Sequence, residues 1–352
     1  MLVVHNPVHH LHEGRKEMFR GRLVDCHETP DRLTRVLAEL QRRGIGPLQA
    51  AVDAGTTLDS ALARIHTPRY LQFLDHAWRD WVALDPANAG RDALPSVWPA
   101  PGMRFDVLPD NFAARLGLFS FDAGTPLTAG SWAAARGGAA CAIGAAEAVL
   151  AAGGRGSAFA LSRPPGHHAG ADFLGGYCFL NNAALAAQAL LDHGHARVAV
   201  LDVDYHHGNG TQSIFYERSD VLTVSIHGDP RTEYPFFLGH ADESGAGAGA
   251  GFNLNLPLPR GTGFDRWRQA LQLGLQAIAQ FDAQALVVSL GVDTFEGDPI
   301  SGFGLKSADY LLLGQDIARA ALPTVFVFEG GYAVDDVGVN TANVIEGFSA
   351  AR

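Results

Sequence analysis

The residues best suited to chemistry in this sequence lie in one short stretch, Leu201–Gly210, which reads LDVDYHHGNG. The mainly apolar run before it predicts a buried strand, and its glycines predict a turn of the kind in which α/β proteins bind ligands. Alternate residues of a strand share one face, so Asp202, Asp204 and His206 are expected to lie side by side. Because such a group is costly without a partner, the spacing indicates a divalent cation.

Three other predicted strands also end in reactive side chains. His167 and His168 follow a strand at 158–162, and Asp293 follows the apolar strand at 285–291. Tyr332 comes after the strand at 323–328 and two glycines. The carboxyl ends of parallel strands lie along one edge of a sheet, where ligands bind. Each group alone also fits a helix cap, a packed loop or a turn, but four such strand ends together indicate one active site.

We predict that Asp204, His206 and Asp293 are the metal ligands. Two carboxylates and one imidazole leave a coordination position open, which suits zinc because it lowers the pKa of a bound water to about 7. Iron(II) and cobalt accept the same ligands, so the ligand types do not select the ion. Asp202, earlier on the same strand, is predicted to orient a histidine from outside the ligand set.

The pair His167 and His168 is predicted to transfer protons at this metal. A water that attacks a carbonyl needs a base, and a departing amine needs an acid. The two glycines before Tyr332 allow the backbone to approach closely, so that its hydroxyl could donate a hydrogen bond to a developing oxyanion. These residue types in combination predict hydrolysis of an amide.

The elements that must position these groups alternate between strands and helices of ten or more residues. This pattern predicts an α/β fold with a doubly wound, mainly parallel sheet covered by helices on both faces. No linker, repeat or change of composition divides the chain, so residues 1–352 are expected to form a single domain. Helices are predicted at 30–43, 68–84, 131–153, 181–193, 263–280 and 307–321, and a further strand at 221–227.

Two segments lack a helical or strand period. The histidine-rich segment 9–17 is predicted to be an exposed loop, because nothing fixes the geometry of its histidines for metal binding. Residues 85–128 form a long irregular segment, which we expect to act in assembly or function. Asp110 and Asp122 are its acidic residues of interest, although solvated loop carboxylates are the simpler interpretation.

Composition excludes some classes of protein. The formal net charge of -11 disfavours nucleic acid as a partner, whereas it is compatible with attraction of a cationic substrate. No run of eighteen apolar residues or signal peptide is found, so we expect a soluble cytoplasmic protein that does not bind membranes. Cys26, Cys141 and Cys178 are few and far apart, which argues against a disulfide framework.

Several motifs together resemble the histone deacetylase superfamily, and the whole chain resembles its branch of bacterial acetylpolyamine amidohydrolases. The motifs that carry the resemblance are RPPGHHAG at 163–170, GGYCFLNN at 175–182, LDVDYHHGNG at 201–210, SLGVDT at 289–294 and EGGY at 329–332. The narrower resemblance adds Glu17, YERSD at 216–220, HGDP at 227–230 with FLG at 237–239, and DPIS at 298–301.

The resemblance implies an arginase-deacetylase fold and zinc-dependent hydrolysis of an acetyl amide to acetate and a free amine. It implies that His168 is the principal general base and acid, and that His167, held by Asp202, is its electrostatic partner. It also implies that Tyr332 polarises the acetyl carbonyl. The substrate channel would be formed by Tyr177, Tyr234, Gly176 and Glu17.

Three further expectations rest on the resemblance alone. A structural potassium ion is expected near the central strand, at Asp202, Asp204, His206, Ser225 and Ile226. Asn209 stands where many members carry aspartate, which would leave His168 with a neutral partner. The segment at 85–128 matches in position an inserted loop that builds a homodimer and narrows the entrance, so a slender acetylated amine would enter and a folded protein would not.

Other functions compete with deacetylation of small amines. A related enzyme could act on acetyl-lysine in peptides or proteins. A ureohydrolase of the same fold would need a second set of ligands for two metals, and Tyr332 would then have no role. A protein of another class could bind acetylated amines through a metal-stabilised site without turnover, although the histidine pair argues against it.

Overall fold

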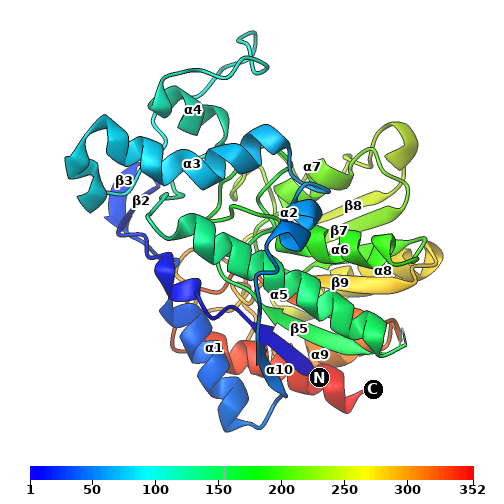
Figure 1. The fold of residues 1–352 in the computed structure, drawn as a ribbon. Helices are drawn as coiled ribbons and strands as arrows, with labels where there is room; N and C mark the ends of the chain where they lie inside the picture. The colour runs from blue at the N-terminus through cyan, green and yellow to red at the C-terminus, as the bar shows by residue number, and fades with distance from the viewer. Residues whose placement is uncertain (154–155) are drawn as a thin grey trace.

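A single eight-stranded sheet forms the centre of the molecule, and every neighbouring pair of its strands is parallel (Figure 1). The computed structural model describes residues 1–153 and 156–352. Across the sheet the strands are ordered β4 (Leu48–Ala50), β1 (Leu2–His5), β5 (Ser157–Leu161), β10 (Thr324–Phe328), β9 (Ala285–Leu290), β6 (Val198–Asp202), β7 (Val221–Gly228) and β8 (Asn253–Leu258).

Helices cover both faces of the sheet, which confirms the predicted doubly wound α/β class (Figure 1). One face is covered by α2 (Thr56–Leu62), α3 (Pro68–Leu84), α4 (Phe112–Leu118), α5 (Ser131–Ala151), α6 (Asn182–Asp192) and α7 (Asn209–Phe215). The other is covered by α1 (Asp31–Arg42), α8 (Phe264–Gln280), α9 (Asp309–Ala318) and α10 (Val337–Ala350).

Alternate residues of each strand pack against the two helical layers. In β6, Val198 and Val200 lie in one core, whereas Ala199 and Leu201 lie in the other. A strand that is buried on both faces reads as a continuous apolar run, which is why β6, β9 and β10 were predictable from sequence. In register, Asp202 at the end of β6 pairs with Ser289 of β9 and with Ser225 of β7.

The prediction of an exposed loop at 9–17 is wrong for two of its residues. His12 is buried and its Nδ1 lies 2.9 Å from the Oγ of Ser131, after a 3-10 turn at His9–Leu11. Glu17 is buried in β2 (Lys16–Phe19), which forms an antiparallel hairpin with β3 (Arg22–Asp25). Contacts with residues far away in the chain order this segment, and such contacts cannot be predicted from the local sequence pattern.

The segment 85–128 is only partly irregular. It contains a 3-10 turn at Pro86–Gly90 and helix α4, whose Phe112 and Leu116 are buried in the core. Ala93 pairs with Leu127 in an isolated bridge that brings the two ends of the segment together. Helix α4 has only seven residues, too few for a periodic pattern to stand out.

Within the described ranges, one helix has the length and apolar composition of a membrane span. This helix is α5, and 61% of its most apolar window is buried. It packs against β5 and α6, and its glycines and alanines allow close approach; a Cβ at Gly137, for example, would overlap the Asn6 side chain. These contacts identify α5 as a core helix.

Candidate metal centre and active site

Three buried side chains meet at the carboxyl edge of the sheet: Asp204, His206 and Asp293. Their ligand atoms all lie within 4.8 Å of one another. The His206 Nδ1 lies 2.9 Å from Asp293 Oδ2 and 3.4 Å from Asp204 Oδ1. Asp204 and His206 follow β6 and Asp293 follows β9, so neighbouring strands bring the three together as the sequence predicts.

Backbone N–H groups hold the two carboxylates in place. Asp204 accepts hydrogen bonds from the His206 N–H at 2.9 Å and from the Gly330 N–H at 2.8 Å. Asp293 accepts one from the Tyr205 N–H at 2.8 Å. Gly291 is also required, because a Cβ there would overlap Asp204. These contacts therefore fix the orientation of both acids.

The electrostatics of these three residues fit a divalent cation. Burial and the neighbouring Asp204 raise the pKa of Asp293 to about 8. Burial alone would lower the pKa of His206, but its hydrogen bonds to Asp204 and Asp293 raise it to about 10. A second negative charge is therefore disfavoured beside Asp204 unless a cation offsets it, and a bound divalent cation would do so with the ligand types zinc prefers.

Two histidines beside this centre have different partners. The His167 Nδ1 lies 2.9 Å from Asp202 Oδ2; burial opposes its protonation, but Asp204 and Asp202 raise its pKa to about 10. The His168 Nδ1 lies 2.6 Å from Asn209 Oδ1. Burial and repulsion from His167 hold the pKa of His168 well below its usual value.

A cavity of about 370 Å³ opens from this centre. Its lining includes His168, His206 and Tyr332 at the reactive end and two aromatic walls, Tyr177 and Tyr234. The rings of Tyr177 and Tyr332 lie 5.6 Å apart, and that of Tyr234 lies 5.2 Å from His168. Such a cavity can hold a narrow aliphatic chain whose end reaches the metal centre.

Gly176 and Asp122 shape the turn that carries the Tyr177 wall. Gly176 has φ of +54°, and a Cβ there would overlap the His168 ring, so only glycine fits. Asp122 accepts hydrogen bonds from the Gly176 N–H at 2.8 Å and from the Tyr234 hydroxyl at 2.6 Å. Asp122 lines the cavity, whereas Asp110 is exposed outside its lining.

Glu17 lies behind the cavity wall. Its Oε1 accepts a hydrogen bond from the Tyr177 hydroxyl at 3.0 Å and lies 2.6 Å from the His27 Nδ1. Glu17 is only 1% exposed and is not among the lining residues, so it holds Tyr177 rather than meeting the cavity itself. The early position of Glu17 in the chain gave no indication of this indirect placement.

Three supporting residues received no role from the sequence, although two of them lie in the motifs at 298–301 and 329–332. Glu329 accepts hydrogen bonds from the N–H groups of Gly166, at 2.6 Å, and of His167, at 3.1 Å, so it fixes the histidine turn. Arg32 of α1 donates to the Gly331 carbonyl at 2.6 Å. An available signal for Arg32 was its place on the apolar stripe of its helix, four residues before Val36. Asp298 is the third, and it accepts from the N–H of Tyr332.

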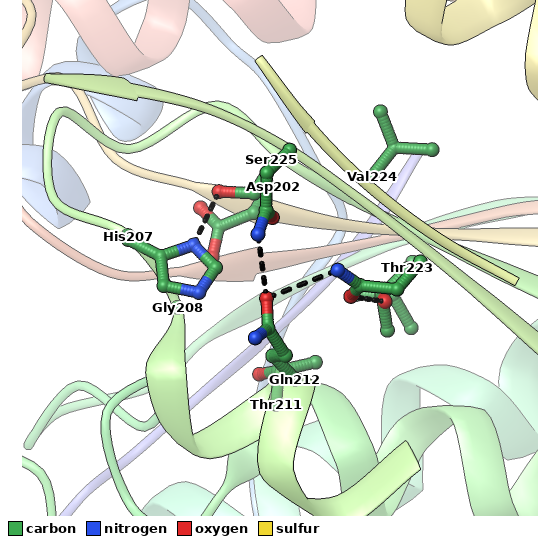
Figure 2. A pocket seen from close by; sticks show the side chains of 11 residues that line it. Asp202, His207, Gly208, Thr211, Gln212, Thr223, Val224 and Ser225 are labelled. Carbon is green, nitrogen blue, oxygen red and sulfur yellow. Dashed lines mark hydrogen bonds between the residues drawn. The ribbon is translucent and has the colours of Figure 1, made fainter. Parts of the chain in front are cut away.

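A second, much smaller cavity of about 10 Å³ lies behind the end of β6 (Figure 2). It is lined by Asp202 and Ser225, two of the five residues expected to bind potassium, but not by the other three. In Figure 2, His207 faces Ser225, and their Nδ1 and Oγ atoms are 3.2 Å apart. Gln212 of α7 accepts from Asn253 at 3.1 Å and Asn255 at 2.8 Å.

These features define a class of protein: a metal-dependent hydrolase with its site at the carboxyl edge of a parallel α/β sheet. The chain belongs to the histone deacetylase family, because the model described as "Histone deacetylase domain" matches residues 26–348. This assignment confirms the resemblance seen in the sequence motifs.

Individual relatives are similar over the whole chain. It is 51% identical to acetylpolyamine amidohydrolase 2 of Pseudomonas aeruginosa over 352 residues, which covers 100% of both chains. It is 46% identical to the acetylpolyamine amidohydrolase of Mycoplana ramosa over 347 residues, or 99% of each. The crystal structure of the acetylpolyamine aminohydrolase from Burkholderia pseudomallei superposes with a TM-score of 0.92 at 39% identity, covering 100% of both chains.

Proposed function

We propose that this enzyme hydrolyses the acetyl amide of small acetylated amines, such as acetylputrescine or acetylcadaverine, to acetate and a free amine. The observation that carries the proposal is the cavity that joins the Asp204, His206 and Asp293 centre to His168 and Tyr332 between aromatic walls. The full-length similarity to acetylpolyamine amidohydrolases supports the choice of substrate.

We assign zinc to Asp204, His206 and Asp293, with iron(II) or cobalt as alternatives accepted by the same ligands. A divalent cation held by these three residues would act as a Lewis acid toward the amide carbonyl and the attacking water. The burial of the three residues keeps bulk water away and strengthens every charge interaction in the site.

The proton-transfer role belongs to His168 in this proposal. Its Nδ1 is held by the Asn209 side-chain oxygen, so its Nε2 is free to accept a proton from the attacking water and return it to the departing amine. His167, ion-paired with Asp202, supplies positive charge beside His168, whose ring centre lies 4.0 Å from that of His167. The Tyr332 hydroxyl donates a hydrogen bond to that oxyanion.

We also propose a structural potassium ion at Asp202, Asp204, His206, Ser225 and Ile226. Support comes from the register that places Asp202 opposite Ser225, and from the Ser225 Oγ beside the metal-bearing strand. Replacement of potassium by lithium during thermal unfolding tests this assignment: we expect a lower Tm in lithium. An equal Tm in both salts would contradict it.

The fold and its exposed surface suggest how the protein assembles. We propose one deacetylase domain over residues 1–352, in which the insertion at about 85–128 pairs two chains as a homodimer. The insertion exposes a set of large apolar side chains, Val97, Trp98, Met103, Phe105, Val107 and Leu108.

We propose a cytoplasmic location, because the three cysteines are free thiols.

Acetate release tests the function directly. Purified enzyme loaded with zinc should release acetate from acetylputrescine, and Tyr332→Phe should lower kcat by about 100- to 1000-fold with zinc still bound. Binding of acetylputrescine without release at any metal loading would instead support a non-catalytic binding protein.

A further inference from the structure

One peptide unit of the active site is held from both ends by charged side chains. This unit joins Gly331 to Tyr332. Its carbonyl oxygen accepts a hydrogen bond from the Arg32 Nε at 2.6 Å, and its N–H donates to Asp298 Oδ2 at 2.7 Å. Arg32 is fully buried on α1, whereas Asp298 lies in the loop after β9, so two separate elements fix the same peptide.

The loop that contains Asp298 is itself tied to the metal centre. The second carboxylate oxygen, Asp298 Oδ1, accepts from the Ile300 N–H at 3.1 Å and closes a turn. Ser301, next in the chain, donates its hydroxyl to the carbonyl oxygen of Asp293. Ile300 also lines the substrate cavity. A displacement of Asp298 would therefore shift both Tyr332 and the cavity residue Ile300.

Tyr332 depends on these contacts for its orientation. Gly331 has φ of +132°, a conformation that only glycine adopts readily. Because Gly331 has no side chain, its own sterics do not fix the orientation of the 331–332 peptide. The Arg32 guanidinium lies 4.6 Å from the centre of the Tyr332 ring and packs against it. The hydrogen bond from the Tyr332 N–H to Asp298 fixes the backbone from the opposite side.

We infer that Asp298 is a positioning residue, which aims the Tyr332 hydroxyl at the reacting carbonyl through the 331–332 peptide. The inference rests on the proposed function only for the role of Tyr332. Asp298 is not among the residues that line the substrate cavity or form the metal centre. A misplacement of about 1 Å at a catalytic group costs about 100-fold in rate, which sets the scale of the expected effect.

A double-mutant cycle in the zinc-loaded enzyme tests the inference. Asp298→Ala should lower kcat by about 10- to 100-fold and change KM less than about threefold, whereas the same change in a Tyr332→Phe background should cost less than about threefold. Asp298→Asn retains one acceptor oxygen and should lose less than Asp298→Ala. Glu296→Ala is the matched control, because Glu296 is exposed in the same loop and should keep full activity.

Equal losses in the two backgrounds would overturn the inference, because Asp298 would then act through the metal or the fold. Unchanged kcat in Asp298→Ala would also overturn it. Binding of a trifluoromethyl ketone analogue of acetylputrescine, measured by calorimetry, gives a readout without turnover. Asp298→Ala should weaken the affinity for this analogue about tenfold when Tyr332 is present, and should leave it unchanged in the Tyr332→Phe background. An inactive wild type that shows this coupling would refute the proposed function and keep the inference.

Discussion

The side-chain oxygen of Asn209 is the only hydrogen-bond partner of the His168 Nδ1 among the described residues, and it carries no charge. A carboxylate there would stabilise the protonated imidazole, so Asn209→Asp should raise the pKa of His168. Because His168 must be neutral to accept a proton, the acidic limb of the kcat/KM profile should move to higher pH. A pH series on both enzymes measures the shift, and superimposable profiles would remove Asn209 from this role.

Gly176 offers a second test at a single residue. A Cβ in Gly176→Ala would overlap the His168 ring, so we expect a loss of about 100-fold in kcat, measured with zinc content unchanged. Gly21→Ala is the control: its φ is +77° but nothing lies within 4 Å of the added Cβ. That variant should lose only about 1–2 kcal/mol of stability. Comparable activity of the two variants would contradict the steric argument.

The reactive residues were easier to predict than the residues that support them. Asp204, His206 and Asp293 could be grouped because strand alternation and a shared sheet edge are properties of local sequence. Asp298 and Arg32 act through backbone groups of residues 331 and 332, far away in the chain, so their roles depend on tertiary contacts. Glu17 was associated with the substrate, yet the structure places it behind Tyr177.

At the scale of elements, buried Glu28 joins helix α1 to the loop after β5. It accepts hydrogen bonds from Arg32 and from Arg163, each at 2.8 Å, and all three side chains are buried. Burial opposes ionisation, but Arg163 and Arg32 keep the pKa of Glu28 below its usual value. The interaction of Glu28 with the two arginines therefore stabilises the fold fully above the pKa that glutamate has in the unfolded chain. This contribution is lost as pH falls through the lower pKa of Glu28 in the folded protein.

Removal of Glu28 leaves two buried guanidinium groups without their carboxylate. Glu28→Ala should lower the free energy of unfolding by about 3–5 kcal/mol, measured by urea denaturation at neutral pH. Glu39→Ala is a suitable comparison, because Glu39 pairs with Arg42 and Arg43 at the other end of α1, nearer the surface, and should cost about 1 kcal/mol or less. Equal costs for the two variants would show that burial does not decide the effect.

The elements recovered from sequence share a simple physical signature. Strands β6, β9 and β10 are continuous apolar runs. Helix α3 begins at Pro68, as predicted, and Thr67 caps it by accepting from the Tyr70 N–H. Helix α10 was missed because it is buried on most sides and has no amphipathic stripe. The short elements α7 and β4 are too brief for a period, and only packing and pairing define them.

At the scale of the whole molecule, the exposed apolar side chains of the insertion at 85–128 can be tested as a dimer interface. Met103 and Phe105 are 60% and 49% exposed on it, so Met103→Asp combined with Phe105→Asp should convert a dimer into a monomer. The measurement is mass by light scattering, with Leu273→Asp on α8, 54% exposed, as the control that stays dimeric. A monomeric wild type with full activity on acetylputrescine would contradict the proposed assembly.

The proposed dimer should also limit which molecules can be deacetylated. We expect the wild type to act on acetylputrescine and to leave acetyl-lysine within a folded protein intact, because only a narrow chain reaches the metal centre through the aromatic walls. The double variant at 103 and 105 should lose part of this selectivity. Efficient deacetylation of an intact acetylated histone by the wild type would favour the peptide-deacetylase alternative.

The most direct test of the proposed metal-dependent deacetylation is acetate release from acetylputrescine by metal-depleted enzyme to which zinc is returned, with Tyr332→Phe carried through the same procedure. We expect no release before zinc is added, release by the wild type afterwards, and about 100- to 1000-fold slower release by the variant at equal zinc content. Release that is independent of metal, or equal in the two enzymes, would contradict it.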